Sequence, residues 1–574
     1  MGKLLSLLKG KYLIMAILTP LLMIGEVLME TTIPRIMAEL VDVGIQNQDI
    51  QYVVRGGFLM VGMSLVSMLF GAGAGRTVSV AAMGFSSEVR RAMFNKIQEF
   101  SFANVDKFST SSLVTRMTTD VNNLQNAFMM VIRSMFRAPV MLISASVMAF
   151  SINARLAVIF LVAVPVLGIF LAFIMTKAHP RFQKMLKKYD KLNSRVQESL
   201  IGIRVVKAFV RGDFEREGFN QTAEDAMNAQ IRAEKLVMFN MPVMQMIVYI
   251  CTLLVLWFGG RFIIGGSMET GGLISFITYT TQILMSLMMM SMSLLMIVIS
   301  RASITRIIEV MNETPDIPDN APQENQVADG SIIFKDVNFS YSGDESNCTL
   351  QNINLEIKSG ETVGIIGGTG SAKTTLVNLI PRFYEVTTGS LLVGGRDVRE
   401  YTQENLRSAV AMVLQNNLLF SGTIKENLRW GNTDATDEEI VAAAVAAQAD
   451  EFIRSFPQGY DTDLNQGGVN VSGGQKQRLC IARALVKKPK IIILDDSTSA
   501  VDTATDIKIR EAFKRDLSDT TTIIIAQRIA SVCEADKIIV MDNGRIDAVG
   551  THDELIKTNE IYREVYESQQ KGVA

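Results

Sequence analysis

The sequence is poor in the residues that build metal, redox and disulfide chemistry. Its 574 residues include four cysteines and two histidines. The cysteines show no metal-binding or redox spacing, and two histidines are too few for a histidine-based metal site. A small disulfide-stapled scaffold is therefore excluded. Charged residues make up 20% and apolar residues 48%, a balance that also rules out a disordered or collagen-like chain.

Charge and methionine are distributed unevenly along the chain. Residues 1–320 hold 30 Lys and Arg against 22 Asp and Glu, a net charge of +8. Residues 321–574 hold 26 against 36, a net charge of −10. The first part also contains 31 of the 33 methionines. We infer that two different kinds of protein are joined in one chain.

The first half contains long apolar runs. Runs without charge occur at 56–75, 138–154, 156–176, 236–260 and 270–300. A sixth apolar segment, about 12–36, is interrupted by Glu26, Glu30 and Arg35. About 20 apolar residues in a helix cross the ~30 Å of hydrocarbon in a bilayer, so the sequence predicts six membrane-spanning helices. We expect no signal peptide, because the apolar stretch after Met1 is too long and lacks a small-residue cleavage site.

Lysine and arginine concentrate near the N-terminus and in two long connections, at about 84–128 and 177–235. The positive-inside rule then places these segments, and the second half of the chain, in the cytoplasm. Apolar spacing in the connections is typical of helices. We expect the tips, near Phe102–Ser112 and Val206–Arg216, to touch another domain, the alternative being solvated loops.

The second half begins after a linker, 314–329, that is rich in Pro, Asn, Asp and Gln. Short β-branched runs then alternate with helical segments. The runs are Thr362–Ile366, Lys490–Leu494, Thr521–Ile525 and Lys537–Met541. This alternation predicts an α/β domain over 330–574 with a largely parallel sheet, following a membrane all-α domain over 1–313.

A glycine-rich loop follows the first of these runs. It reads Gly367, Gly368, Thr369, Gly370, Ser371, Ala372, Lys373 and Thr374, with Thr375 next. A strand, a glycine-rich loop and Lys-Thr at a helix start form a phosphate-binding arrangement, in which the hydroxyl of Thr374 can hold Mg²⁺. Ala372 stands where a glycine is expected, and an ordinary glycine-rich turn is the alternative. If this position needs a positive φ, alanine costs about 1 kcal/mol or more.

Two further elements support a nucleotide site. The apolar run Ile491–Leu494 ends in Asp495, an acid that can organise Mg²⁺ through water. A second anion-binding element consists of Ser472, Gly473, Gly474 and Gln475 at a helix start. One nucleotide rarely needs two such elements from one chain, so we expect the second element to face a nucleotide held by another subunit.

With these motifs, residues 330–570 resemble the nucleotide-binding domain of ABC transporters. The whole chain resembles a bacterial half-transporter of the type IV exporter group, and most closely the heterodimeric multidrug exporters. The resemblance implies ATP and Mg²⁺ as cofactors. It assigns Gly367–Thr374 to Walker A, Ile491–Asp495 to Walker B, Val471–Gln475 to the signature motif acting in trans, Gln415 to the Q-loop that contacts Mg²⁺, Tyr341 to adenine stacking and Ser499–Asp502 to the D-loop. It also implies coupling helices at both cytoplasmic tips.

The chain departs from the family pattern at two catalytic positions. Asp496 stands where the family has the glutamate that positions the attacking water, and Gln527 stands at the switch histidine. Aspartate is one methylene shorter, and glutamine cannot carry the imidazolium charge. We expect this Walker site to bind ATP and hydrolyse it slowly, while the intact signature completes a competent site on a non-identical partner. Neutral drift, with both residues still working, is the alternative.

The expected function is ATP-driven export of amphipathic, drug-like compounds across the bacterial plasma membrane. Candidate substrate residues are Glu26, Glu30, Met285, Met289, Met292 and Met296. The acids fit cationic drugs or an outer gate, or else are structural; some of the methionines would face lipid or pack between helices. A lipid or peptide exporter and an ATP-gated regulatory subunit remain alternatives. Basic residues in the membrane half follow topology, so nucleic-acid binding is not expected.

Overall fold

A computed structural model describes residues 2–317, 322, 325–497 and 502–571. The chain divides into two compact units. The first consists of 1–99 and 108–313, and the second of 100–107 and 314–574. The short segment 100–107 therefore belongs with the C-terminal unit, although it lies between two long membrane helices in the sequence.

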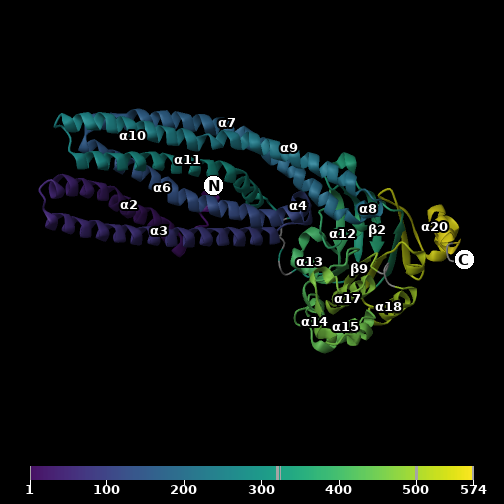
Figure 1. Ribbon diagram of the computed structural model, residues 1–574. Coiled ribbons are helices and arrows are strands. Elements are labelled where there is room, and N and C mark those ends of the chain that lie inside the picture. Colours follow the sequence, from purple (N-terminus) through teal and green to yellow (C-terminus); the bar gives the residue numbers. More distant parts are fainter. Residues whose placement is uncertain (1, 318–321, 323–324, 498–501, 572–574) are drawn as a thin grey trace. The chain divides into compact units, whose positions relative to one another are not determined.

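The first unit is built from long helices that run side by side (Figure 1). They are α2 (Gly10–Glu39), α3 (Ile50–Gln98), α6 (Val121–Ile152), α7 (Ala154–Ile201), α9 (Gly212–Met238), α10 (Asn240–Ile264) and α11 (Thr270–Asn312). Shorter helices are α1 (Gly2–Leu5), α5 (Thr110–Thr115) and α8 (Ile203–Ala208), with π-helical turns at Leu40–Ile45 and Arg116–Asp120.

Six helical segments in the described residues are long and apolar enough to cross a membrane. They are Gly10–Ile45, Ile50–Gln98, Thr110–Ile152, Ala154–Ile201, Gly212–Ile264 and Thr270–Leu294. The prediction of six membrane-spanning helices with long helical extensions is confirmed. Many of their large apolar side chains, such as Phe58 and Ile169, are exposed in the unit, as expected for surfaces that face lipid.

Specific polar contacts join the helices, and one of them fixes the start of α11. The buried carboxylate of Asp42 accepts hydrogen bonds from the backbone N–H groups of Gly271, at 2.6 Å, and Gly272, at 3.2 Å. These are among the N–H groups that have no partner within α11, so the carboxylate satisfies the start of that helix. A Cβ atom at Gly271 would lie 2.4 Å from the carbonyl oxygen of Ala38, which explains the glycine.

The described residues of the second unit form three sheets. Its strands are β1 (Ile332–Phe339), β2 (Leu350–Ile357), β3 (Thr362–Gly367), β4 (Thr388–Val393), β5 (Arg396–Asp397), β6 (Val410–Val413), β7 (Gly422–Thr423), β8 (Asp463–Leu464), β9 (Ile491–Asp495), β10 (Thr521–Ile525), β11 (Lys537–Asp542) and β12 (Arg545–Gly550). The six-stranded sheet has the order β12-β11-β3-β10-β9-β6 and is parallel except for β12. The predicted parallel sheet is confirmed.

A second, four-stranded sheet of order β2-β1-β4-β5 is antiparallel. The helices of this unit are α4 (Phe102–Phe108), α12 (Lys373–Leu379), α13 (Gln403–Ala409), α14 (Ile424–Arg429), α15 (Asp437–Ala446), α16 (Asp450–Ser455), α17 (Gly473–Val486), α18 (Thr503–Asp516), α19 (His552–Thr558) and α20 (Glu560–Lys571). Of these, α4 runs on to Phe108, the first residue after the segment 100–107. Strands β9 and β10 are buried along their whole length, as expected for central strands of a parallel sheet.

Candidate functional site

The phosphate loop joins β3 to α12. Gly367 is required because a Cβ atom there would lie 2.1 Å from the carbonyl oxygen of Met541. Gly370 has φ +86°, and Ala372 has φ +68° and ψ +23°. The position of Ala372 therefore does need the left-handed conformation, which costs a residue with a Cβ atom roughly 1–2 kcal/mol. The loop keeps its shape at the expense of local strain.

Lys373 lies inside this loop. Its ammonium group donates hydrogen bonds to the carbonyl oxygens of Gly367 at 2.9 Å and Gly368 at 2.7 Å, and to the hydroxyl of Ser371 at 3.2 Å. Burial lowers the pKa of Lys373, while the charges of Asp495 and Asp496 oppose this shift. The charge is thus held at the start of α12, where backbone N–H groups also favour an anion.

The acid at the end of β9 meets the helix start. Thr374 donates its hydroxyl hydrogen to Oδ2 of Asp495 at 2.9 Å. Asp495 is 2% exposed, and burial raises its pKa. A hydroxyl and a carboxylate at this separation are hard oxygen ligands of the kind that Mg²⁺ prefers. The donor set therefore fits Mg²⁺ with a bound triphosphate.

Three residues expected at the site converge on one carboxylate. Oδ2 of Asp496 accepts a hydrogen bond from Nε2 of Gln527 at 2.9 Å and a longer one from Nε2 of Gln415 at 3.5 Å. Asp496 directly follows β9 with φ +47°, and burial raises its pKa. The two residues expected at catalytic positions are thus in contact with each other, and the glutamine expected in the Q-loop joins them.

The aromatic residue expected to stack on adenine lies beside α12. The hydroxyl of Tyr341 is 3.1 Å from the hydroxyl of Thr375, and the residue is 52% exposed. The ring of Tyr384 packs edge-on against it at 5.1 Å. Tyr384 in turn donates its hydroxyl hydrogen to Asp106 at 2.8 Å. A chain of contacts therefore leads from the adenine position to the segment 100–107.

The signature residues form a capped helix start. Ser472 is the N-cap of α17: its hydroxyl accepts from the N–H of Gln475 at 3.3 Å, and the Gln475 side chain accepts from the N–H of Ser472 at 2.9 Å. Gly473 and Gly474 form the first turn. Among the described residues, no hydrogen bond is found between this helix start and the phosphate loop. Of the expected D-loop, Ser499, Ala500 and Val501 lie outside the described residues.

The acids of the first membrane helix have a basic partner. Arg137, on α6, lies 2.6 Å from a carboxylate oxygen of Glu30 and 3.3 Å from one of Glu26. Sequence reasoning missed Arg137, because it lies just outside the uncharged run that begins at 138. Its position near the edge of a predicted span, opposite two unexplained acids, was the available signal.

The methionines of α11 separate into two groups. Met289, Met292 and Met296 line a cavity of about 440 Å³, together with residues of α6. Met288 and Met290 pack against a buried cluster that contains Leu284 and Leu287, and Met285 is 54% exposed. Three of the four methionines expected at the substrate site therefore share one cavity.

Comparisons with known proteins agree with this architecture. Family models described as the ABC transporter transmembrane region and as ABC transporter match residues 16–288 and 350–499. The ABC transporter ATP-binding protein YfiB of Bacillus subtilis (strain 168) is 38% identical over 569 residues, covering 99% of this chain and 98% of the relative. The chain belongs to the ABC transporter family.

Two further likenesses refine this assignment. A bacterial Atm1-family ABC exporter with ATP bound superposes with a TM-score of 0.85 at 25% identity, covering 97% of this chain and 98% of that one. YgaD of the same Bacillus strain, provisionally described as a multidrug export ATP-binding/permease protein, is 34% identical over 84% of this chain and 83% of the relative. The chain is thus an ATP-driven ABC exporter with the type IV exporter fold.

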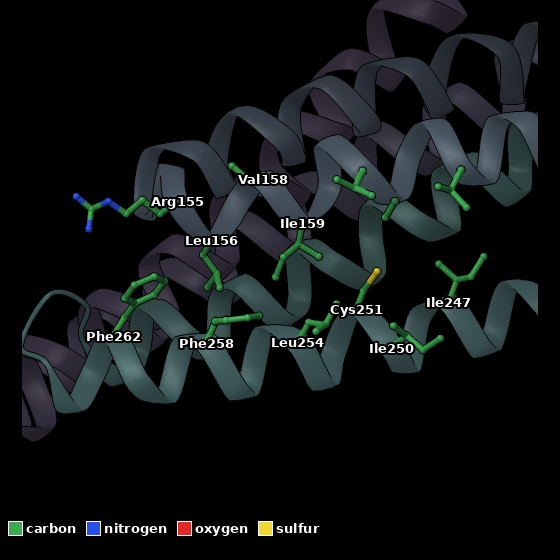
Figure 2. A pocket seen from close by; sticks show the side chains of 13 residues that line it. Arg155, Leu156, Val158, Ile159, Ile247, Ile250, Cys251, Leu254, Phe258 and Phe262 are labelled. Atoms are coloured by element: carbon green, nitrogen blue, oxygen red, sulfur yellow. The ribbon is translucent and has the colours of Figure 1, made fainter.

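A second cavity of this ABC exporter, about 530 Å³, lies between α7 and α10 (Figure 2). Its walls are apolar side chains such as Leu254 and Phe258, with Arg155 at one end. None of the expected substrate residues is among the described residues that line it. We refer to it as the groove between α7 and α10.

Proposed function

We propose that this ABC exporter chain works as one of two non-identical subunits. The contact between Asp496 and Gln527 carries the proposal, because a short carboxylate held by two amides is poorly suited to act as a base. A general base must lie within hydrogen-bond reach of the proton that it takes, and Asp496 is one methylene shorter than the glutamate of the family pattern. The same chain keeps an intact, capped signature helix. We therefore infer that its own Walker site is slow and that its signature completes a faster site on the partner.

In this mechanism Lys373 and the first turn of α12 bind the phosphates of ATP. With the nucleotide bound, Thr374, Asp495 and Gln415 would hold Mg²⁺. The bound nucleotide supplies the phosphoryl bond whose hydrolysis drives the cycle. Because the nucleotide would lie between Walker residues of one subunit and the signature of the other, its binding favours the closed pair of nucleotide-binding domains. A slow site keeps this closure for longer.

The segment 100–107 is suited to carry this closure toward the membrane helices. Phe102 stacks on Phe383 with ring centroids 4.3 Å apart, and Asp106 accepts the hydroxyl of Tyr384. All of these residues belong to the second compact unit. The segment therefore moves with the nucleotide-binding domain, while its sequence neighbours continue into α3 and α6.

We further propose that the exporter moves amphipathic, drug-like compounds across the bacterial plasma membrane. The distribution of Lys and Arg favours a cytoplasmic location for both termini and for the ATP-binding domain. The methionine-lined cavity of about 440 Å³ suits varied apolar ligands, since methionine side chains adapt to different shapes. The description of YgaD as a multidrug export protein supports the same substrate class.

An asymmetric pair of variants tests the two-subunit arrangement. The chain is co-expressed with the product of the adjacent gene, the co-purified complex is placed in nanodiscs, and phosphate release is measured. Ser472→Ala should lower the ATPase rate at least tenfold, because the signature serves the fast site. Lys373→Ala should lower it less than threefold, because it disables only the slow site.

A control separates the role of Ser472 in capping from its role at the nucleotide. Thr436 is the N-cap of α15 in an equivalent capping box with Glu439, so Thr436→Ala removes a similar cap elsewhere in the domain. We expect it to leave the ATPase rate within twofold of wild type. Equal losses in the Ser472 and Lys373 variants would contradict the proposal and indicate two equivalent sites. ATP-dependent dye efflux from vesicles tests export itself, because a regulatory subunit would bind ATP without efflux.

A further inference from the structure

The cavity between α6 and α11 has a cationic lining. It is formed by Asn126, Met129, Met130, Arg133, Ser134, Arg137, Met289, Met292 and Met296. No carboxylate is among these described lining residues. The cavity therefore combines an apolar, adaptable surface with two guanidinium groups, a chemistry opposite to the one that Glu26 and Glu30 suggest from sequence alone.

The cavity lies about one hydrocarbon thickness from one end of the bundle. Arg133 precedes the end of α6 at Ile152 by 19 residues, and Met289 follows the start of α11 at Thr270 by 19 residues. At 1.5 Å per residue, both lie about 29 Å from those helix ends. The hydrocarbon core is about 30 Å thick, so the cavity lies at its opposite margin, on the cytoplasmic side in the proposed orientation.

The two arginines differ in their partners. Arg137 is paired with both Glu26 and Glu30, so its charge is already taken up by carboxylates of this chain. Within the described part of the chain, no ion pair or hydrogen bond of the Arg133 side chain is found, and that residue is exposed toward the cavity. A charged side chain that lines a largely apolar cavity is costly to leave without a polar or charged partner. Arg133 is thus the group in this cavity whose charge is left for a ligand.

We infer that this cavity binds amphipathic anions. The carboxylate, sulfonate or phosphate of the ligand pairs with Arg133, while Asn126 and Ser134 offer hydrogen bonds. The apolar part of the ligand lies against Met289, Met292 and neighbouring methionines. The inference rests on the proposed export function and names its substrate class: amphiphiles with a negative head, taken from the cytoplasmic side of the bilayer.

Equilibrium binding of two matched probes tests the inference. Dansyl-undecanoate and the neutral dansyl-undecanol share one tail and differ in the head group. Each is titrated, without nucleotide, into the full complex in phosphatidylcholine nanodiscs, and dansyl fluorescence gives Kd. Arg133→Gln should raise the Kd of the carboxylate probe at least tenfold, equivalent to about 1.4 kcal/mol. It should change the Kd of the alcohol probe less than twofold. Arg133→Lys should retain carboxylate binding within about threefold.

Arg155→Gln is the matched control, since Arg155 is another exposed arginine of the membrane unit but lines the groove between α7 and α10. It should leave both Kd values within twofold. Equal weakening by Arg155→Gln and Arg133→Gln would overturn the inference, because general membrane-surface charge would then explain binding. Equal effects of Arg133→Gln on both probes would also overturn it.

A second arm distinguishes a lipid head group from a free amphiphile. Phosphatidylglycerol is added to the nanodiscs. If the added lipid competes and the carboxylate probe no longer binds, a lipid phosphate is a ligand of the same site. If the probe still binds, the ligands are free anionic amphiphiles. Either result supports an anion site if Arg133→Gln shows the expected selectivity. Because binding is measured without nucleotide, a complex that binds the anion but shows no efflux would contradict export and leave the site intact.

Discussion

Replacing Asp496 by glutamate should accelerate ATP hydrolysis by the self-paired chain by about 100-fold. In a pair of identical chains, each composite site contains Asp496 together with an intact signature. The Asp496 carboxylate lies 2.9 Å from the amide of Gln527, which keeps it close to the end of β9. Glutamate adds one methylene, about 1.5 Å of reach. A misplacement of about 1 Å costs around 10²-fold in rate, equivalent to about 2.7 kcal/mol of activation free energy.

The assay is phosphate release by the chain purified alone in nanodiscs. Asp461→Glu is the control, because it makes the same chemical change at an exposed turn. It should leave the rate within twofold of wild type. Adding Asp495→Asn to the Asp496→Glu variant should abolish the gain, since the Mg²⁺ ligand is lost. If the wild-type chain alone turned over several ATP molecules per second, and Asp496→Glu changed this by less than twofold, the proposed slow site would be refuted.

Three other changes test separate parts of the structure. Ala372→Gly relieves about 1–2 kcal/mol of strain from the left-handed backbone conformation. It also loses about 0.4–1 kcal/mol, because glycine raises the conformational entropy of the unfolded chain. The thermal midpoint of the nucleotide-binding unit should therefore rise slightly, and a lower midpoint would contradict the strain. Asp120→Ala removes a buried carboxylate that pairs through two bonds with Arg306. Because the Arg306 side chain is 45% exposed, water can solvate the charge that remains, so the loss should be that of charged hydrogen bonds, about 1.5–3 kcal/mol, read as a lower midpoint in thermal unfolding. Tyr384→Phe removes the hydrogen bond to Asp106. The basal ATPase rate of the complex should persist, while the stimulation of that rate by substrate should fall. Unchanged stimulation would show that this contact does not couple substrate binding to ATP hydrolysis.

The central sheet was predictable because burial on both faces leaves a direct trace in the sequence. Strand β10 has the predicted bounds, Thr521–Ile525, and every residue of it is buried. The antiparallel sheet leaves no such trace. In its strand β1, Lys335 and Asp336 are both exposed, which breaks the alternation of buried and exposed residues. The register of β1 with β2 shifts between Phe334 and Val337. A bulge of this kind removes the period of two on which sequence reasoning depends.

At the nucleotide site, motif spacing predicted the positions but not the contacts among them. Asp496 and Gln527 were expected at a base position and a switch position 31 residues apart. That the Gln527 amide holds the Asp496 carboxylate depends on β9 and β10 lying side by side in parallel, so that both residues follow neighbouring strand ends. Likewise, the positive φ of Ala372 follows from the path of the loop. From the sequence alone, a positive and a negative φ were both possible at this position.

The membrane site shows why counting charges misleads when the pairing is unknown. From sequence, two acids in the first span suggest attraction of a cation. In the structure Arg137, on a different helix, pairs with both of them and cancels one of the two negative charges. It lies 107 residues from Glu30, too far for any local pattern to reveal the pair. Once that pair is taken into account, the charge left facing the methionine-lined cavity is that of Arg133. The sign of the expected ligand therefore reverses, from cationic to anionic, without any change in the number of charged residues.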